Sequence, residues 1–325
     1  MKEIIISTND AGRRLDRFLR KYLPDAALGQ IYKIIRKDVK VDGRRQDESY
    51  MLSEGEVLTL YLSDADLDKF RASVSKASSG HAKRQFKIVY EDDDILIVDK
   101  PFGLLTHGDS VEKKNHLANQ VKDYLIEQGS YNPRAEKVFA PAPANRIDRN
   151  TTGLVLFGKT AAGLKGLNEL IREDKIQKYY LTIVHGIIDS DMVLEGTLVK
   201  DSCKNKVSID ESESGLAIKT IVKPLETLDK DTTLVCVELV TGRSHQIRAH
   251  LASIGHPIIG DCKYAGTWAR ANKFFHENFK LDTQLLHAYK LQFSDTISDL
   301  EYLAGKEFKA EIPATFSEIL DKLKK

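Results

Sequence analysis

Asn145-Arg-Ile-Asp-Arg-Asn-Thr-Thr-Gly-Leu-Val-Leu-Phe157 joins a charged cluster to an apolar run. The run from Leu154 to Phe157 is typical of a buried β-strand. The cluster before it is not explained by hydrophobic periodicity. If the backbone there is extended, Arg146 and Asp148 project from one face and Ile147 from the other. The segment therefore predicts a core strand preceded by a carboxylate that lies among guanidinium groups.

A second polar cluster, Thr241-Gly-Arg-Ser-His-Gln-Ile-Arg-Ala-His250, follows another apolar strand. It predicts a turn and then a helix on which Ser244 and Arg248 are i,i+4 neighbours. Arg248 could then approach Asp148, keep the carboxylate ionised and lower its pKa. An ionised, buried carboxylate is a candidate nucleophile. The alternative is a structural Arg-Asp pair, or a turn cap beside the threonines that follow.

The region around these clusters mixes strands with helices in no regular alternation. An α+β fold with a mixed, largely antiparallel sheet is therefore predicted, rather than a doubly wound one. Strands are expected at 86–90, 95–98, 154–157, 180–184 and 233–239, and helices at 117–127, 161–173, 245–254 and 316–323.

The N-terminal region is locally basic although the whole chain has a formal net charge of only +1. Between Arg13 and Arg45 there are 11 Lys or Arg residues and 4 acidic ones. Apolar residues recur there at helical spacing, which predicts two short amphipathic helices with basic outer faces. A strand at 39–41, a turn at Asp42-Gly43 and a closing strand at 57–62 should complete a small α+β unit. Such a basic face can also be merely solvated.

The chain is predicted to consist of a basic domain at 1–63, a linker at 64–85 and a second, larger domain at 86–325. The linker prediction rests on a Ser-, Ala-, Lys- and Asp-rich composition with weak apolar periodicity.

Several function classes lack their signatures in this sequence. There is no Gly-rich dinucleotide or phosphate-binding loop, no His-Glu-x-x-His and no Gly-x-Ser-x-Gly elbow. The histidines are scattered, and no metal site is predicted. Cys203, Cys236 and Cys262 are widely spaced, so reduced, structural thiols are expected. No apolar run approaches the roughly 20 residues that cross a bilayer, and no secretory signal is visible, so a cytoplasmic protein without membrane contact is expected.

Motifs in the basic N-terminal unit resemble those of the S4 domain, a small RNA-binding module. They are Arg14-Leu-Asp-Arg-Phe-Leu, Ile31-Tyr-Lys-Ile-Ile-Arg-Lys, Val39-Lys-Val-Asp-Gly and Gly55-Glu-Val-Leu. The resemblance implies binding of structured RNA that weakens as salt rises. The residues expected to contact RNA are Arg14, Arg17, Lys33, Arg36 and Lys37.

Five further motifs, in order along the chain, resemble those of the RluA/RluC-type pseudouridine synthases. They are Asp99-Lys-Pro-Phe-Gly-Leu-Leu-Thr-His, Arg146-Ile-Asp-Arg-Asn-Thr-Thr-Gly, Gln177-Lys-Tyr-Tyr-Leu-Thr-Ile-Val-His-Gly, Leu239-Val-Thr-Gly-Arg-Ser-His-Gln-Ile-Arg-Ala-His and Gly255-His-Pro-Ile-Ile-Gly-Asp-Cys-Lys-Tyr. With the S4-like segment, the resemblance covers nearly the whole chain. It departs from many members at Asn145, where they carry His, and at Thr182, where a small apolar residue is usual.

The resemblance implies isomerisation of uridine to pseudouridine in RNA, without a cofactor. Asp148 would be the essential carboxylate, attacking either the sugar or the base. Tyr180 would stack on the flipped uracil and take part in removing the proton from carbon 5, while Tyr179 beside it is the alternative contact.

Other motif residues are expected to act around Asp148. Arg248 would pair with the carboxylate and Arg146 would be a second contact. Arg243 would meet phosphate or hold its loop, and Lys100 and His107 would bind substrate or serve the structure.

Competing interpretations remain open at this level. The first is an RNA-binding or ribosome-assembly factor without catalysis, and the second is an RNA hydrolase or glycosidase that uses Asp148 with water. The RluC-like layout points to large-subunit ribosomal RNA as the substrate, with transfer RNA as the alternative. A monomer is expected.

Overall fold

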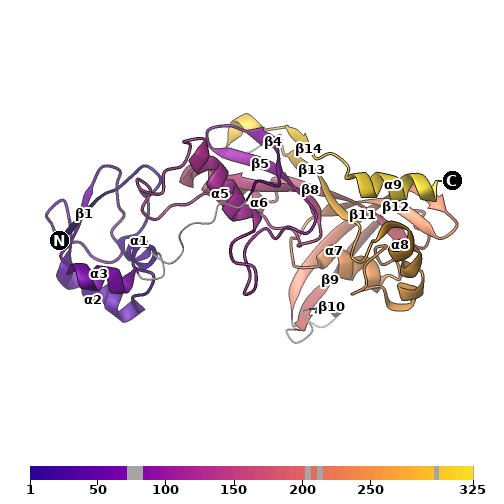
Figure 1. Ribbon diagram of the computed structural model, residues 1–325, viewed down its shortest axis with the longest axis horizontal. Helices are drawn as coiled ribbons and strands as arrows, with labels where there is room; N and C mark the ends of the chain where they lie inside the picture. Colours follow the sequence, from indigo (N-terminus) through magenta and orange to yellow (C-terminus); the bar gives the residue numbers. More distant parts are fainter. Residues whose placement is uncertain (72–82, 202–205, 211–214, 296–299, 325) are drawn as a thin grey trace.

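The computed structural model describes residues 1–71, 83–201, 206–210, 215–295 and 300–324. Two units lie side by side along the long axis of the molecule (Figure 1). The first contains a three-stranded sheet and the second an eleven-stranded sheet, and each has its own hydrophobic core.

The N-terminal unit packs helices against a small antiparallel sheet of strand order β1-β3-β2. Its elements are β1 (Lys2–Ile5), α1 (Leu15–Tyr22), α2 (Leu28–Asp38), β2 (Val39–Val41), β3 (Val57–Leu60) and α3 (Asp64–Phe70). The apolar stripes of α1 and α2 are buried, as their spacing predicted. Both basic helices, the strand at 39–41 and the closing strand are thereby confirmed, the last being shorter than predicted.

Helix α3 corrects the predicted start of the linker, since residues 64–70 are helical and belong to the N-terminal unit. Ser63 caps the helix by accepting a hydrogen bond from the Asp66 amide. Phe70 is buried in the N-terminal core, and Leu67 packs against that core. The predicted linker residues 72–82 lie outside the described residues.

The second unit is built on one sheet of strand order β10-β9-β11-β12-β8-β13-β7-β5-β4, with β14 beside β13 and β6 beside β7. Neighbouring strands are antiparallel except β13 and β7, which are parallel, so the predicted mixed, largely antiparallel sheet is confirmed. The strands are β4 (Lys87–Glu91), β5 (Ile95–Lys100), β6 (Ala142–Pro143), β7 (Thr152–Gly158), β8 (Ile176–His185), β9 (Met192–Asp201), β10 (Lys206–Asp210), β11 (Leu216–Asp229), β12 (Thr232–Leu239), β13 (Leu286–Phe293) and β14 (Glu307–Lys309). The helices are α5 (Leu117–Glu127), α6 (Ala161–Arg172), α7 (Gln246–Ser253), η1 (Gly266–Arg270), α8 (Asn272–Phe279), η2 (Glu301–Leu303) and α9 (Ala314–Leu323).

Strands β5 and β7 are buried on both faces, which explains their continuous apolar sequences. Side chains alternate along a strand, so Val155 and Phe157 join the core that contains α5 residues, whereas Leu154 and Leu156 join the core that contains α6 residues. The two helices therefore cover opposite faces of this part of the sheet. The loop that leads into β7, which carries Asp148, is thereby attached to a rigid strand.

Helix α7 begins at Gln246, and His245 before it has a left-handed backbone with φ 56°. The predicted helical i,i+4 relation between Ser244 and Arg248 is therefore wrong, because Ser244 precedes the helix. The other predicted helices are confirmed to within two residues at each end.

No helix in the described part of the chain is both long and apolar enough to cross a bilayer. Cys236 and Cys262 are free thiols, and Cys203 lies outside the described residues.

Candidate active site

Asp148 lies in the loop between β6 and β7, where side chains alternate as the sequence predicted. Arg146 is exposed, Ile147 is buried in the main core, and the Asp148 side chain is 25% exposed. The amide of Thr151 donates to the carbonyl of Asp148 at 3.1 Å, which closes a turn directly before β7. The carboxylate therefore faces solvent from a loop fixed at both ends.

Two buried side chains hold the backbone on either side of Asp148. Thr106 Oγ1 donates to the carbonyl of Ile147 at 3.0 Å. Lys100 Nζ donates to the carbonyls of Arg149 at 3.0 Å, Leu104 at 2.7 Å and Pro101 at 3.1 Å. The segment after β5 is thus joined to the Asp148 loop.

Lys100 is 0% exposed, so its predicted contact with substrate is wrong. The reason is that its side chain turns inward to three carbonyl groups. Burial lowers the pKa of Lys100 to about 7, against the opposing effects of the Asp148 and Asp99 charges. The structure gives Lys100 the alternative, structural role.

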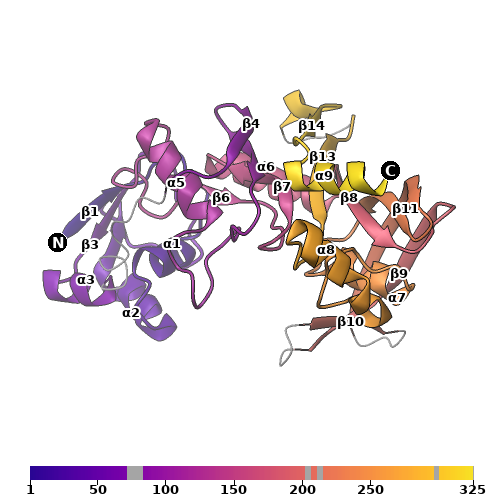
Figure 2. The same ribbon diagram turned by 45° about the vertical axis from the view of Figure 1, so that its right-hand side comes forward.

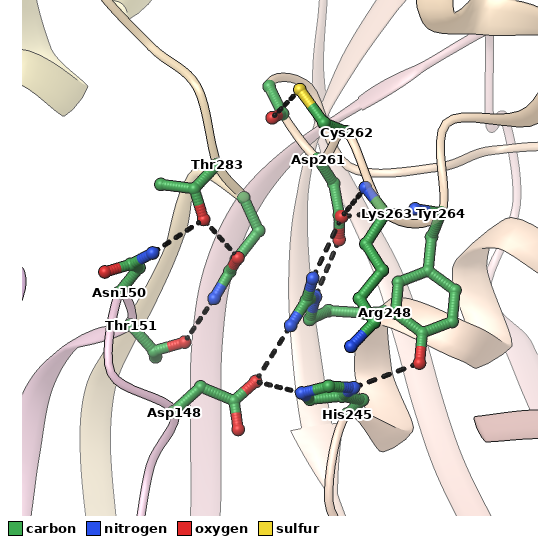
Figure 3. A network of polar contacts seen from close by, with 12 residues as sticks. Asp148, Asn150, Thr151, His245, Arg248, Asp261, Cys262, Lys263, Tyr264 and Thr283 are labelled. Atoms are coloured by element: carbon green, nitrogen blue, oxygen red, sulfur yellow. Dashed lines mark hydrogen bonds and ion pairs between the residues drawn. The ribbon is translucent and has the colours of Figure 1, made fainter. Parts of the chain in front are cut away.

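Arg248 reaches Asp148 from helix α7, as predicted, with Nη1 3.3 Å from Oδ2 (Figure 3). Its other nitrogens bind Asp261 more closely, Nε at 2.7 Å to Oδ2 and Nη2 at 3.0 Å to Oδ1. Asp261 is fully buried and also accepts the backbone amides of Lys263 and Tyr264. Burial opposes the charge of Arg248, but Asp261 and then Asp148 outweigh it and raise the pKa of the guanidinium. Arg248 therefore stays charged between two carboxylates.

His245 is a site residue that the sequence reasoning missed. Its Nε2 lies 3.8 Å from Asp148 Oδ2, and its Nδ1 lies 3.0 Å from the hydroxyl of Tyr264. Burial lowers its pKa, against the opposing effect of the Asp148 charge. The left-handed backbone at His245 turns the ring toward Asp148, a geometry that residue spacing does not reveal. Asp261 and Tyr264 were also missed, although both lie in the last of the five family-like motifs.

An inner pocket of about 80 Å³ opens beside Asp148, with Tyr180, Leu239 and Leu286 among its lining residues. Tyr180 is 5% exposed, and burial followed by the Asp148 charge raises the pKa of its hydroxyl. Tyr179 lies elsewhere, because its ring is 4.5 Å from Lys290 Nζ and does not line this pocket. Of the two tyrosines, the structure brings Tyr180 to Asp148.

An outer cleft of about 470 Å³ shares Asp148, His245 and Arg248 with the inner pocket. Arg146 and His107 line this cleft, and Arg243 lines the inner pocket. Within the described residues no ion pair joins Arg146 to Asp148, so the predicted second contact is not present. Asp148 thus stands where a small, partly apolar pocket meets a wider cleft with arginines along it.

No group of three or more His, Cys, Asp or Glu side chains that could hold a metal ion occurs among the residues that the structure describes. The chemistry that the arrangement itself offers is that of a carboxylate beside a fixed guanidinium, next to an aromatic surface.

Two solved structures share the architecture of the second unit. Human RNA pseudouridylate synthase domain containing 4 matches with a TM-score of 0.56 at 22% identity, covering 73% of this chain and 92% of that one. Human RNA pseudouridylate synthase domain containing 1 matches with a TM-score of 0.51 at 19% identity, over 76% of this chain and 97% of that one. The fold is therefore that of the pseudouridylate synthases.

Sequence comparison extends this from fold to family. The family model described as RNA pseudouridylate synthase matches residues 94–253. Ribosomal large subunit pseudouridine synthase C of Vibrio cholerae is 30% identical over 99% of this chain and 96% of that protein. The Escherichia coli protein of the same name is 31% identical over 90% of this chain and 89% of that protein. The chain belongs to the RluA/RluC-type RNA pseudouridine synthases, so the predicted family and enzyme class are confirmed.

Proposed function

We propose that this pseudouridine synthase modifies uridine in large-subunit ribosomal RNA, with Asp148 as the nucleophile. The observation that carries the proposal is the position of Asp148, which lies between the inner pocket and the outer cleft and is held 3.3 Å from Arg248. The ribosomal substrate is supported by the names of the relatives, several of which are called ribosomal large subunit pseudouridine synthase C.

The two cavities suggest where the base and the sugar-phosphate part of a bound nucleotide would lie. The uracil would turn out of its stack and enter the inner pocket over Tyr180, while the sugar-phosphate chain stays in the outer cleft. Asp148 would then lie next to the bond between N1 and the ribose. In the reaction Asp148 would bond transiently to the sugar or the base and be released again. The bond between N1 and the ribose breaks, carbon 5 bonds to the ribose, and carbon 5 loses a proton while N1 gains one. Flipping costs a few kcal/mol, and stacking on Tyr180 would offset about 1–3 kcal/mol of it.

Arg248 would hold Asp148 oriented for attack. A guanidinium with nitrogens on two edges can bind Asp261 and Asp148 at once, which a lysine ammonium cannot do with the same geometry. His245, in the neutral form that its lowered pKa favours, adds a polar group on the other side of the carboxylate.

The arginines and His107 of the cavities would bind the RNA backbone, His107 as a neutral imidazole because burial, followed by the Arg146 charge, lowers its pKa. Arg146 and His107 in the outer cleft and Arg243 beside the inner pocket are exposed and would contact phosphates or the sugar next to the flipped nucleotide. These contacts would position the RNA and carry little sequence information.

The N-terminal unit would act as an S4-type RNA-binding domain. Arg17, Lys33, Arg36 and Lys37 are exposed on α1 and α2. Arg14 is engaged by Asp16 through two hydrogen bonds of 3.1 Å and would contribute less than the other four. The domains would be 1–71 for RNA binding and 83–325 for catalysis, in a monomeric, cytoplasmic enzyme that needs no cofactor.

The test is to map pseudouridine after incubating the purified protein with unmodified large-subunit ribosomal RNA and, separately, with transfer RNA. New pseudouridine in the ribosomal transcript supports the proposal. Modification of transfer RNA alone would contradict the substrate, and none in either would contradict the activity.

The RNA-binding role is tested with the double variant Lys33→Glu, Arg36→Glu. It should weaken binding of the ribosomal transcript and make the slope of log affinity against log salt shallower. Unchanged affinity and slope would contradict an S4-type role.

A further inference from the structure

Asp10 lies in the N-terminal unit, but its carboxylate accepts hydrogen bonds from the second unit of the fold, called the catalytic unit below. It is 0% exposed and accepts three successive backbone amides of the segment between α5 and β6. The distances are 2.9 Å from Lys137 and 3.3 Å from Val138 to Oδ2, and 2.8 Å from Phe139 to Oδ1. Hydrogen bonds to an ionised acceptor are among the stronger ones in proteins, and a buried carboxylate needs them.

Side chains next to Asp10 in the sequence extend the same contact. Ser7 Oγ donates to Glu136 Oε2 at 2.8 Å, and Asn9 Nδ2 donates to Glu136 Oε1 at 3.1 Å. The other end of the Asn9 amide, Oδ1, accepts the amide of Ala161 at 2.8 Å, at the start of α6. The segment 7–10 therefore binds two separate parts of the catalytic unit.

Apolar packing crosses the same junction. Val138 packs against the N-terminal core, whereas Phe139, the next residue, is buried in the catalytic core. In Figures 1 and 2 the chain between α5 and β6 extends to the N-terminal unit, near α1. Two neighbouring residues thus join two cores.

Between the units lies a cavity of about 400 Å³ that is lined by Arg13 from the N-terminal side and by Lys165 and Arg172 from α6. Three basic residues and one acidic residue, Glu169, which pairs with Arg172, line the cavity. The lining is therefore basic on balance and continues the positive charge of α1 toward the catalytic unit.

We infer that Asp10 is a positioning residue that holds the N-terminal unit in a fixed orientation on the catalytic unit. The basic faces of α1 and α2 and the outer cleft then contact one RNA at a set separation. Domains joined only by a chain usually move relative to each other, and a second contact then acts at a reduced effective concentration. The inference rests on the proposed RNA-binding role of the N-terminal unit.

The test compares two substrates, a long large-subunit ribosomal RNA transcript and a short stem-loop that contains the modified uridine and reaches only the catalytic cleft. Asp10→Ala should raise KM for the transcript about tenfold or more, because the N-terminal unit loses its orientation, and leave kcat unchanged. Both constants for the stem-loop should stay as in the unchanged protein. Glu3→Ala, which removes an exposed carboxylate from β1, is the matched control and should change neither substrate.

Because Asp10→Ala could also disturb folding of the N-terminal unit, two further variants separate docking from folding. Glu136→Ala removes the partner of Ser7 and Asn9 from the catalytic side and should raise KM for the transcript in the same direction. A disulfide between Asn9→Cys and Ala161→Cys, added to Asp10→Ala, should restore KM when oxidised and lose this effect when reduced. An unchanged transcript KM in Asp10→Ala and Glu136→Ala, or equal loss on the stem-loop, would overturn the inference.

Failure of this inference can be told from failure of the proposed RNA-binding role. If Lys33→Glu, Arg36→Glu leaves KM for the transcript unchanged, the proposed role fails. If that variant raises KM but Asp10→Ala does not, the role stands and only the fixed orientation is contradicted.

Discussion

Arg248 is bound more closely by Asp261 than by Asp148. Two of its nitrogens contact Asp261 at 2.7 and 3.0 Å, and a third lies 3.3 Å from Asp148. The buried carboxylate fixes the guanidinium, and the guanidinium in turn faces the carboxylate at the pocket. The orientation of Asp148 therefore depends on Asp261, a residue that does not itself line either cavity.

Asp261→Asn should weaken both the fold and the reaction. Loss of one partner of a buried ion pair lowers the free energy of unfolding by about 3–5 kcal/mol. With Arg248 less well placed, kcat should fall by about tenfold to hundredfold while KM for RNA changes little. Urea unfolding and single-turnover rates measure the two effects, with Asp189→Asn, an exposed carboxylate, as control. A normal kcat in a folded Asp261→Asn protein would show that Arg248 does not need the ionic contact with Asp261 to be placed for catalysis.

Replacement of Tyr180 should separate stacking from proton transfer. Burial and the Asp148 charge raise the pKa of the Tyr180 hydroxyl, so its ionised form is rare at neutral pH and the ring is expected to matter more than the hydroxyl. Tyr180→Phe should keep most of the activity. Tyr180→Ala should lower kcat/KM by the worth of one stacking contact, about 1–3 kcal/mol or roughly fivefold to 150-fold.

Tyr179→Ala serves as the matched control for these variants, because its ring lies against Lys290 outside the pocket. If Tyr180→Phe were as inactive as Tyr180→Ala, the hydroxyl would be part of the chemistry and the stacking account would be wrong.

Two buried histidines should make the fold sensitive to acid. Burial lowers the pKa of His250 to about 4 and that of His287 to about 4, whereas in the unfolded chain the value is about 6.5. Between these values the unfolded state binds more protons, so stability falls as the pH drops from about 6.5 to about 4. Each histidine contributes a slope of at most about 1.4 kcal/mol per pH unit.

Urea unfolding measured across this pH range checks the prediction. His250→Gln should flatten the dependence, because it removes a buried group whose pKa is lowered in the folded state. Equal slopes for the unchanged protein and His250→Gln would show that His250 is not the titrating group.

Much of the catalytic unit could be predicted from hydrophobic pattern alone. The apolar runs of β5 and β7 and the apolar stripes of α5 and α6 are clear sequence signals, because each element buries a whole face in the core. The sequence predicts a linker where helix α3 lies, because the seven residues of α3 include only two apolar positions with core contacts. The helix depends on packing and on the Ser63 cap.

The site was predicted in part, for a similar reason. The Asp148 and Arg248 pair followed from two charged clusters in otherwise apolar surroundings. His245 and Asp261 were missed because their roles depend on a left-handed residue and on a contact between α7 and the loop after it. The motif leaves both a substrate-binding and a structural role open for Lys100, because it records a residue's presence and not the direction of its side chain.

The central claim, that Asp148 performs the isomerisation, is tested most directly by tritium release from large-subunit ribosomal RNA carrying uridine labelled at carbon 5. Each turnover removes the hydrogen from carbon 5, so release counts product. The unchanged protein and Asp189→Asn should release tritium at the same rate, and Asp148→Asn, though folded and still binding RNA, should release none above background. Release by Asp148→Asn at the rate of the unchanged protein would contradict the account.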